Sequence, residues 1–119
     1  MNKKLLLAGS LFGLFAVILG AFAAHGLKDK IDIASLESFQ TGVKYQMYHA
    51  LLLLIIGGTN FVSEKTKKIL LFFIVIGVIF FSGSIYGLST SAVTGINFKP
   101  IAFITPIGGL FLILSWGIL

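Results

Sequence analysis

Four long hydrophobic runs, separated by short polar or charged segments, divide the chain. These runs cover approximately residues 4–27, 41–62, 68–91 and 101–119. Each run has about 20 residues or more, the length that an α-helix needs to cross the hydrocarbon core of a bilayer. The pattern predicts an all-α integral membrane protein. We expect a four-transmembrane-helix bundle that forms a single membrane domain over residues 1–119.

The first run has an alternative interpretation as a secretory signal. Met1-Asn2-Lys3-Lys4 precedes the apolar residues, and Ala21-Phe22-Ala23 fits the A-x-A pattern of a cleavage site. The apolar stretch is longer than the roughly 7–15 residues of a typical signal core, and three more runs follow it. We therefore expect an uncleaved first span.

The segment between the first two runs is charged but not uniformly polar. Residues 28–40 hold three of the four acidic residues of the chain, and apolar residues recur among them at mixed spacings. These spacings are compatible with a short helix that lies on a membrane surface. We expect a short interfacial amphipathic segment between spans 1 and 2, with a solvated loop as the alternative.

The second run changes character along its length. Its first half contains Tyr45, Gln46, Tyr48 and His49, whereas its second half is almost entirely Leu and Ile. On a helix, Tyr45, Gln46 and His49 lie close together on one face. Polar groups at this depth are costly to leave unpaired, so the other spans should be arranged to cover them.

The other spans carry polar residues at a similar depth. At 1.5 Å per residue, Ser82 and Tyr86 lie roughly 13 and 7 Å from the end of the third run, and Thr105 lies about 6 Å into the fourth. His25 lies at the same end of the first run. All four spans thus place polar groups in one half of the bilayer. The candidate ligand-binding pocket consists of His25, Gln46, Tyr48, His49, Ser82, Tyr86 and Thr105.

Small residues recur on the faces of the predicted helices. In the first run, glycines and alanines follow one another at intervals of three and four, which forms a stripe that a neighbouring helix can approach closely. Such faces also predict self-association into a homo-oligomer. The predicted packing positions are Gly9, Gly13, Gly20, Gly83, Gly87, Gly108 and Gly109.

Composition supports the membrane class and excludes some chemistry. Hydrophobic residues make up 57% of the chain and charged residues 11%, with a mean hydropathy of +1.05, where a soluble domain has about 25% charged residues. The absence of cysteine excludes disulfides, thiolate metal sites and thiol catalysis. The net charge of +5 comes from lysines that mostly flank the apolar runs, so we expect contact with the lipid bilayer and not with nucleic acid.

The lysines also predict an orientation. With four spans, the two termini and the turn at 63–68 lie on one side, which holds five lysines against four on the other. The positive-inside rule therefore places the N- and C-termini in the cytoplasm. Trp116, near the chain end, suits a membrane surface as an aromatic anchor.

The distribution of polar residues argues against transport and catalysis. The other half of the bilayer contains no polar groups for a channel, and the chain lacks the internal repeats typical of coupled transporters. His25 and His49 are weak candidates for a metal pair, because zinc sites normally have more ligands. Ser82 or Ser84 could approach His49, but no acidic residue lies within the spans to orient the histidine. We expect no catalytic residue, no metal and no cofactor.

Four strings of the sequence occur together in a specific order. They are Gly20-Ala21-Phe22-Ala23-Ala24-His25-Gly26-Leu27, the stretch from Phe39 to Leu51, Phe81-Ser82-Gly83-Ser84-Ile85-Tyr86, and Ile104-Thr105-Pro106-Ile107-Gly108-Gly109. Together they resemble one bacterial membrane-protein family, domain of unknown function 423, which is related to the eukaryotic transmembrane protein 256. The resemblance covers nearly the whole chain, with one departure at Ala23-Ala24, where many members have Gly-Ala. It implies a four-span inner-membrane protein of unassigned activity, with family motif residues at His25, Gly26, Thr41, Gly42, Gln46, Tyr48, His49, Ser82, Gly83, Tyr86, Thr105, Pro106 and Gly108.

Two functions are compatible with these observations. The first is a small multi-pass protein of the bacterial inner membrane that affects membrane organisation or stabilises membrane-protein partners. In that case, His49 would bond Gln46, Tyr86 or a serine across the bundle. The alternative is a binding module whose polar pocket, in the outer half of the bilayer, holds a lipid headgroup, a quinone-like ligand or a metal.

Overall fold

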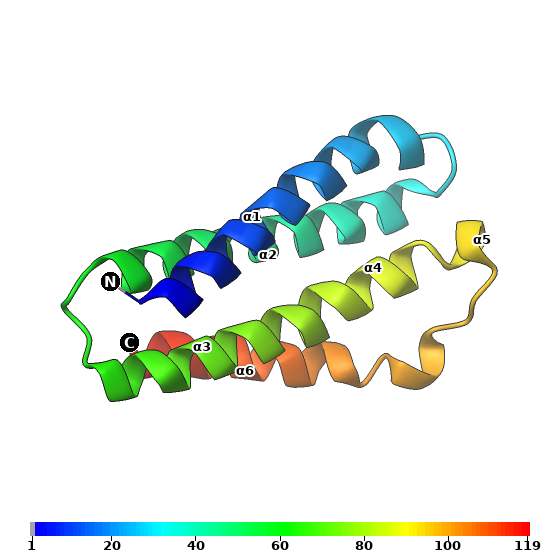
Figure 1. Cartoon of the computed structure of the whole chain (residues 1–119). Helices are drawn as coiled ribbons and strands as arrows, with labels where there is room; N and C mark the ends of the chain where they lie inside the picture. Colours follow the sequence, from blue (N-terminus) through cyan, green and yellow to red (C-terminus); the bar gives the residue numbers. More distant parts are fainter. Residues whose placement is uncertain (1) are drawn as a thin grey trace.

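The computed structural model describes residues 2–119, and within that range it contains helices and no strands. Figure 1 shows α1 beside α2 as one antiparallel pair, and the continuous rod of α3 and α4 beside α6 as another. The elements are α1 (Lys3–Phe22), the π-helical turn η1 (Ala23–Leu27), α2 (Ile33–Gly58), α3 (Glu64–Val78), the π-helical turn η2 (Ile79–Gly83), α4 (Ser84–Ser89), α5 (Ser91–Thr94), the 3₁₀ turn η3 (Lys99–Ile101) and α6 (Ile104–Ile118).

Three helical stretches are long and apolar enough to cross a membrane by length and composition. They are Lys3–Leu27, Glu64–Ser89 and Lys99–Ile118. The 26-residue α2 is not among them, because Lys44, Gln46 and His49 lower the hydropathy of its first half. Hydropathy thus identifies three of the four expected spans.

The start of α2 differs from the sequence expectation. A separate amphipathic segment before Thr41 was expected, but one unbroken helix runs from Ile33 to Gly58. The reason lies in Phe39, which is 2% exposed and packs with Ala23 and Leu27 of η1. This contact anchors the first turns of α2 on the end of the first helix, so they belong to α2 instead of forming an element of their own.

The end of α2 is held by a buried lysine. Lys67 is only 1% exposed, and its Nζ donates a hydrogen bond to the carbonyl oxygen of Thr59 at 2.7 Å. The backbone N–H of Asn2 donates to the carbonyl of Gly57 at 2.9 Å. A cation near a helix C-terminus is favourable because of the helix dipole and the unpaired last carbonyls. Sequence reasoning treated Lys67 only as a topology signal and missed this role.

The apolar core lies in the half of the molecule that contains the chain ends. Its buried members come from four helices, and Phe81 and Leu71 pack against them. They are Leu5, Leu52, Leu53, Ile56, Leu70, Ile74, Val78 and Leu112. The half that the sequence predicted to be sealed by hydrocarbon packing is therefore where the principal apolar core forms.

Several predicted glycines lie where helices approach closely. A Cβ at Gly108 of α6 would overlap the backbone of Phe80 and Phe81, and one at Gly9 would lie 2.9 Å from the carbonyl oxygen of Ala50. Gly87 faces the ring of Phe98. Looser contacts, between 3.5 and 3.9 Å, surround Gly13, Gly20 and Gly109.

Gly83 does not fit the expectation of a packing position. It is exposed, and a Cβ there would find nothing within 4 Å. The π-helical turn η2 contains this residue, and such a turn changes the phase of the helix relative to a regular α-helical period. Three close-packed glycines were missed in its place, namely Gly42, Gly57 and Gly77.

The contrast between Gly108 and Gly83 gives a first prediction. Gly108→Ala should destabilise the protein by about 1–3 kcal/mol, because a methyl group would push α6 away from the backbone of Phe80 and Phe81. Gly83→Ala is the matched control and should be neutral or slightly stabilising, because its methyl group meets open space. Thermal unfolding in detergent measures both. Equal effects of the two substitutions would contradict the close crossing at Gly108.

Candidate functional site

Gln46 lies at the centre of the polar residues and is bonded to two other helices. Its Nε2 donates to the carbonyl oxygen of Phe12 in α1 at 2.9 Å. Its Oε1 accepts a hydrogen bond from the Tyr86 hydroxyl of α4 at 2.6 Å. The side chain is 5% exposed. One amide of α2 thus uses both ends to connect α1 with α4.

His49, one turn further along α2, is bonded on both ring nitrogens. Nδ1 lies 2.6 Å from the carbonyl oxygen of Tyr45, and Nε2 lies 3.2 Å from the indole Nε1 of Trp116 in α6. The indole can only donate, so Nε2 is the acceptor and the proton is on Nδ1, which donates to Tyr45. The imidazole is therefore neutral, and the lone pair on Nε2 accepts the hydrogen bond from Trp116.

The partner of His49 differs from the expected ones. Sequence reasoning offered Gln46, Tyr86 or a serine, and it placed Trp116 at the membrane surface as an anchor. Long helical side chains point back toward the helix N-terminus, and the indole of Trp116 thereby reaches the ring of His49 at a centroid distance of 6.1 Å. The lone tryptophan of the chain ties α6 to α2.

Two serines near the π-helical turn η2 face different neighbours. Ser82 is 1% exposed and donates to the carbonyl oxygen of Gly42 in α2 at 2.7 Å. Ser84 forms a hydrogen bond with Thr105 of α6 and donates to the carbonyl oxygen of Phe80. Neither serine is bonded to His49, so the structure does not contain the serine–histidine pair that a hydrolase of this kind would need.

His25 and Tyr48 lie away from this group. His25 is exposed in the middle of η1, whose first and last residues, Ala23 and Leu27, pack on Phe39. Ten residues of helix separate Phe39 from His49, which corresponds to roughly 15 Å. This separation is too large for His25 and His49 to share a metal ion. Tyr48 is 53% exposed and points outward.

The candidate residues therefore do not line one common pocket. His49 borders a cavity of about 290 Å³ whose other walls are mostly apolar, including Tyr45, Phe81 and Trp116. Thr105 borders a separate cavity of about 390 Å³, together with Ser35, Ser38 and Ser89. What the structure brings together is a set of separate hydrogen bonds between helices, which we call the polar network. Gln46 bonds Tyr86, His49 bonds Trp116, Ser84 bonds Thr105, and Ser82 bonds the carbonyl oxygen of Gly42.

The polar network is closed. Within residues 2–119, every fully buried side-chain nitrogen or oxygen has a hydrogen-bond partner. Burial of an unpaired polar group would cost about 1–3 kcal/mol, so each bond across helices fixes their relative positions. Chemically, the network can hold helices in register, but it offers no activated nucleophile and no free metal ligand.

Comparison with known proteins identifies the family of this chain. A sequence profile of the family described as "Protein of unknown function (DUF423)" matches residues 19–109. The chain belongs to the DUF423 family. The match confirms the resemblance drawn from the sequence motifs, and it covers all members of the polar network except Trp116.

Relatives in the DUF423 family are membrane proteins by name. A UPF0382 membrane protein of Staphylococcus epidermidis is 40% identical over 98% of this chain and 92% of its own length. The UPF0382 membrane protein YwdK of Bacillus subtilis is 40% identical over 96% of this chain and 90% of its own length. The UPF0382 inner membrane protein YgdD of Escherichia coli is 30% identical over 99% and 87%. No solved structure matches.

The bond between Gln46 and Tyr86 gives a second prediction. In a double-mutant cycle of Gln46→Leu and Tyr86→Phe, we expect a coupling free energy of about 0.6–1.7 kcal/mol, the range measured for hydrogen bonds between membrane helices. Unfolding in mixed micelles of increasing denaturing-detergent content measures the four stabilities. Tyr48→Phe is the matched control and should leave stability unchanged, because its ring is half exposed. Additive effects of the two substitutions would contradict the bond.

Proposed function

We propose that this DUF423 protein is a structural or interaction protein of the bacterial cytoplasmic membrane. It acts through its outer surface, by affecting membrane organisation or by stabilising membrane-protein partners. The observation that carries this proposal is the closed polar network. Because the buried polar side chains are bonded to other groups of the protein, they serve the protein's own architecture and leave the exterior as the surface that acts on other molecules.

The proposal includes four membrane spans. The apolar stretches Lys3–Leu27, Glu64–Ser89 and Lys99–Ile118 supply three, and α2 supplies the fourth. At 26 residues, α2 is about 39 Å long, which exceeds a hydrocarbon core of about 30 Å. Its polar residues Gln46 and His49 are covered by the neighbouring helices, which removes the main obstacle to crossing. The first turns of α2, from Ile33, would then lie at the interface.

The proposal also includes self-association, but through other faces than expected. The glycine stripe of α1 is occupied by α2, since Gly9, Gly13 and Gly20 have Ala50 or Val43 as nearest neighbours. It cannot therefore mediate contact with a second copy. Of the predicted packing glycines, Gly83 is open on the outer surface, which makes its face of the α3–α4 rod the candidate contact for another chain.

The proposed orientation, with both termini in the cytoplasm, gives a third prediction. The chain contains no cysteine, so single cysteines can be labelled without background. A membrane-impermeant maleimide applied to spheroplasts should label Asp29→Cys and should leave Lys65→Cys unlabelled until the membrane is opened. Both positions are exposed, and Figure 1 shows the turn after η1 and the turn between α2 and α3 at opposite ends of the bundle. The reverse pattern would place the termini outside.

Action through the outer surface gives a fourth prediction. Photo-crosslinking residues introduced in living cells at Tyr48, Phe72 or Ile113, which are 53%, 58% and 69% exposed, should give discrete protein adducts from at least one face. The same residue at Leu53, which is fully buried, should give none and serves as the control. Adducts of twice the chain mass would identify the partner as a second copy.

Adducts to lipid alone at all three exposed positions would contradict the proposal. A second measurement distinguishes the absence of a protein partner from unfolding of the variants. His49→Ala should lower the unfolding temperature, because it leaves the indole N–H of Trp116 unpaired. The surface substitutions should not change that temperature.

A second candidate function, a binding module, is favoured by one observation. The 390 Å³ cavity has a buried hydroxyl-bearing residue in its wall, Ser89, which is only 6% exposed. Ser35, Ser38 and Thr105 line the same cavity, so the site would suit a ligand with hydroxyl or carbonyl groups, such as a lipid headgroup or a quinone-like ring. Native mass spectrometry of gently extracted protein, with an adduct that disappears in Ser89→Val, would favour this candidate over the first.

A further inference from the structure

A groove runs between α1 and α3 on the outer surface of the protein. It encloses about 500 Å³, and its walls are apolar residues of the two helices, including Leu7 and Leu11 on one side and Phe72 and Val75 on the other. Lys4 and Lys68 lie at one end of it. A second hollow of about 560 Å³ shares Lys4 and Lys68 with the groove. The surface thus combines an apolar channel with a polar, basic end.

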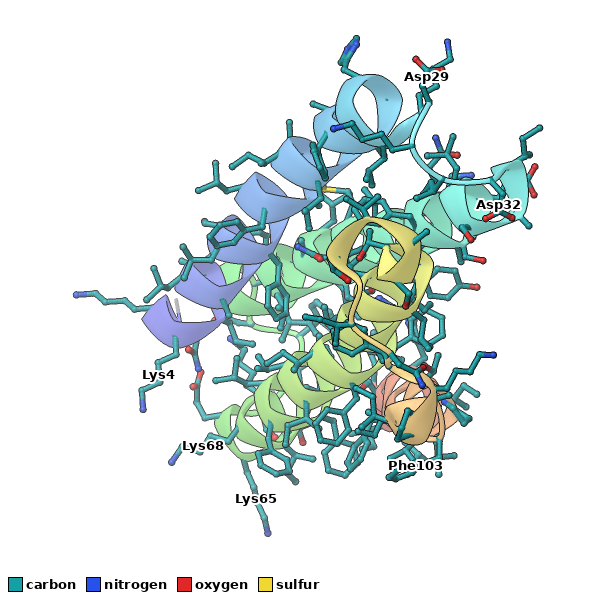
Figure 2. All side chains as sticks on the ribbon, turned by 90° about the vertical axis from the view of Figure 1, so that its right-hand side faces the viewer. Lys4, Asp29, Asp32, Lys65, Lys68 and Phe103 are labelled. Carbon is teal, nitrogen blue, oxygen red and sulfur yellow. The ribbon has the colours of Figure 1, made fainter. Side chains whose placement is uncertain are left out.

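The two lysines at this end have no acidic partner. The only ion pair among residues 2–119 joins Lys67 to Glu64, at 3.6 Å. Glu64 also lines the second hollow, but its charge is offset by Lys67. Figure 2, which looks along the bundle, shows Lys4, Lys65 and Lys68 grouped on one side of the view. Asp29 and Asp32 belong to the turn before α2, which lies in Figure 1 at the opposite end of the bundle from the start of α1 and α3. An anion is therefore the complementary ligand for this end of the groove.

The helices that form the groove strengthen this preference. Both α1 and α3 begin at the lysine end, at Lys3 and Glu64, so their N-termini carry partial positive charge there. Lys3 and Lys4 lie in the first turn of α1, which contains no acidic residue. Cations at a helix N-terminus are unfavourable, and a bound anion relieves that repulsion.

The dimensions match one leaflet of a bilayer. From Lys4 to Leu11 the groove follows seven residues of helix, which corresponds to about 10 Å. Half of a hydrocarbon core measures roughly 15 Å. The groove therefore runs from the membrane surface, where the lysines lie, through about two-thirds of that leaflet. An acyl chain that follows it has its headgroup at the lysines.

We propose that this groove is a binding site for an anionic phospholipid, in which one acyl chain lies between α1 and α3 and the phosphate lies between Lys4 and Lys68. Basic residues at the membrane surface between transmembrane helices are a recognised arrangement for anionic headgroups. The site shares no residue with the polar network, and it does not depend on the proposed partner-binding role.

Native mass spectrometry in a neutral detergent tests this fifth prediction. The protein is titrated with phosphatidylglycerol and, separately, with zwitterionic phosphatidylcholine of the same acyl chains. We expect tighter binding of phosphatidylglycerol. Lys4→Gln and Lys68→Gln should each weaken it about fivefold, and the double variant about 25-fold, as follows from the contribution of one lysine near an anionic surface. All these side chains are exposed, so the variants should retain their unfolding temperature.

Three controls separate the groove from general attraction to charge. Lys65 is an exposed lysine at the same end of the protein, but it does not line the groove. Lys65→Gln should therefore change binding less than twofold. Val75→Phe fills the groove and should weaken binding of both lipids. Glycerol phosphate, which has no acyl chains, should not bind or compete. Equal losses in Lys65→Gln and Lys68→Gln, no preference for phosphatidylglycerol, or competition by glycerol phosphate would each overturn the proposal.

Discussion

The hydrogen bonds of Gln46 set the arrangement of the helices around α2. An amide buried between apolar helices must find both a donor and an acceptor inside the protein, because an unpaired polar group there is costly. Gln46 finds them in the carbonyl of Phe12 and the hydroxyl of Tyr86, which fixes α1 on one side of α2 and α4 on another. His49 repeats the principle toward α6 through Trp116. Helix α2 is thus bonded to α1, α4 and α6 along its length, and Lys67 of α3 is bonded to the residue just past its C-terminal end.

These bonds depend on close contacts that only glycine permits. A Cβ at Gly42 would lie 2.9 Å from the ring of Tyr86, so any larger residue would move α4 away and draw the Tyr86 hydroxyl from Gln46. The carbonyl of Gly42 also accepts the bond from Ser82. One glycine therefore allows both the approach of the helix and the bonds that hold it. Separately, Gly77 and Gly108 allow α3 and α6 to pack along their length, which brings Thr105 to Ser84.

The position of polar residues along each helix could be predicted from the sequence, but their direction around the helix could not. Counting residues along each run placed Gln46, Ser82, Tyr86 and Thr105 in the same half, and the structure bonds all four into the polar network. The same count included His25 and Tyr48. His25 lies exposed in η1, near the end of the first helix, and Tyr48 lies on the outer face of α2. Gly83 was misplaced because the π-helical turn η2 breaks the regular period used to assign faces. Trp116 and Lys67 were misplaced because long side chains act one turn or more from their backbone position. No local pattern encodes which way such side chains turn.

The two ends of the molecule carry different charges and therefore differ in the ligands they attract. Summed over the bundle, helix dipoles do not distinguish the two ends, because α1 and α3 begin at one end and α2 and α6 begin at the other; they favour an anion only at the groove, which α1 and α3 form. Side chains decide the difference. At the start of α1 and α3, Lys67 offsets Glu64 and leaves the remaining lysines without carboxylate partners, whereas Asp29, Asp32 and Glu37 accompany the lysines at the other end. There the cavity lining is hydroxyl-bearing and apolar, with no charged residue. A phosphate is therefore attracted to the lysine end and a neutral polar group to the opposite end.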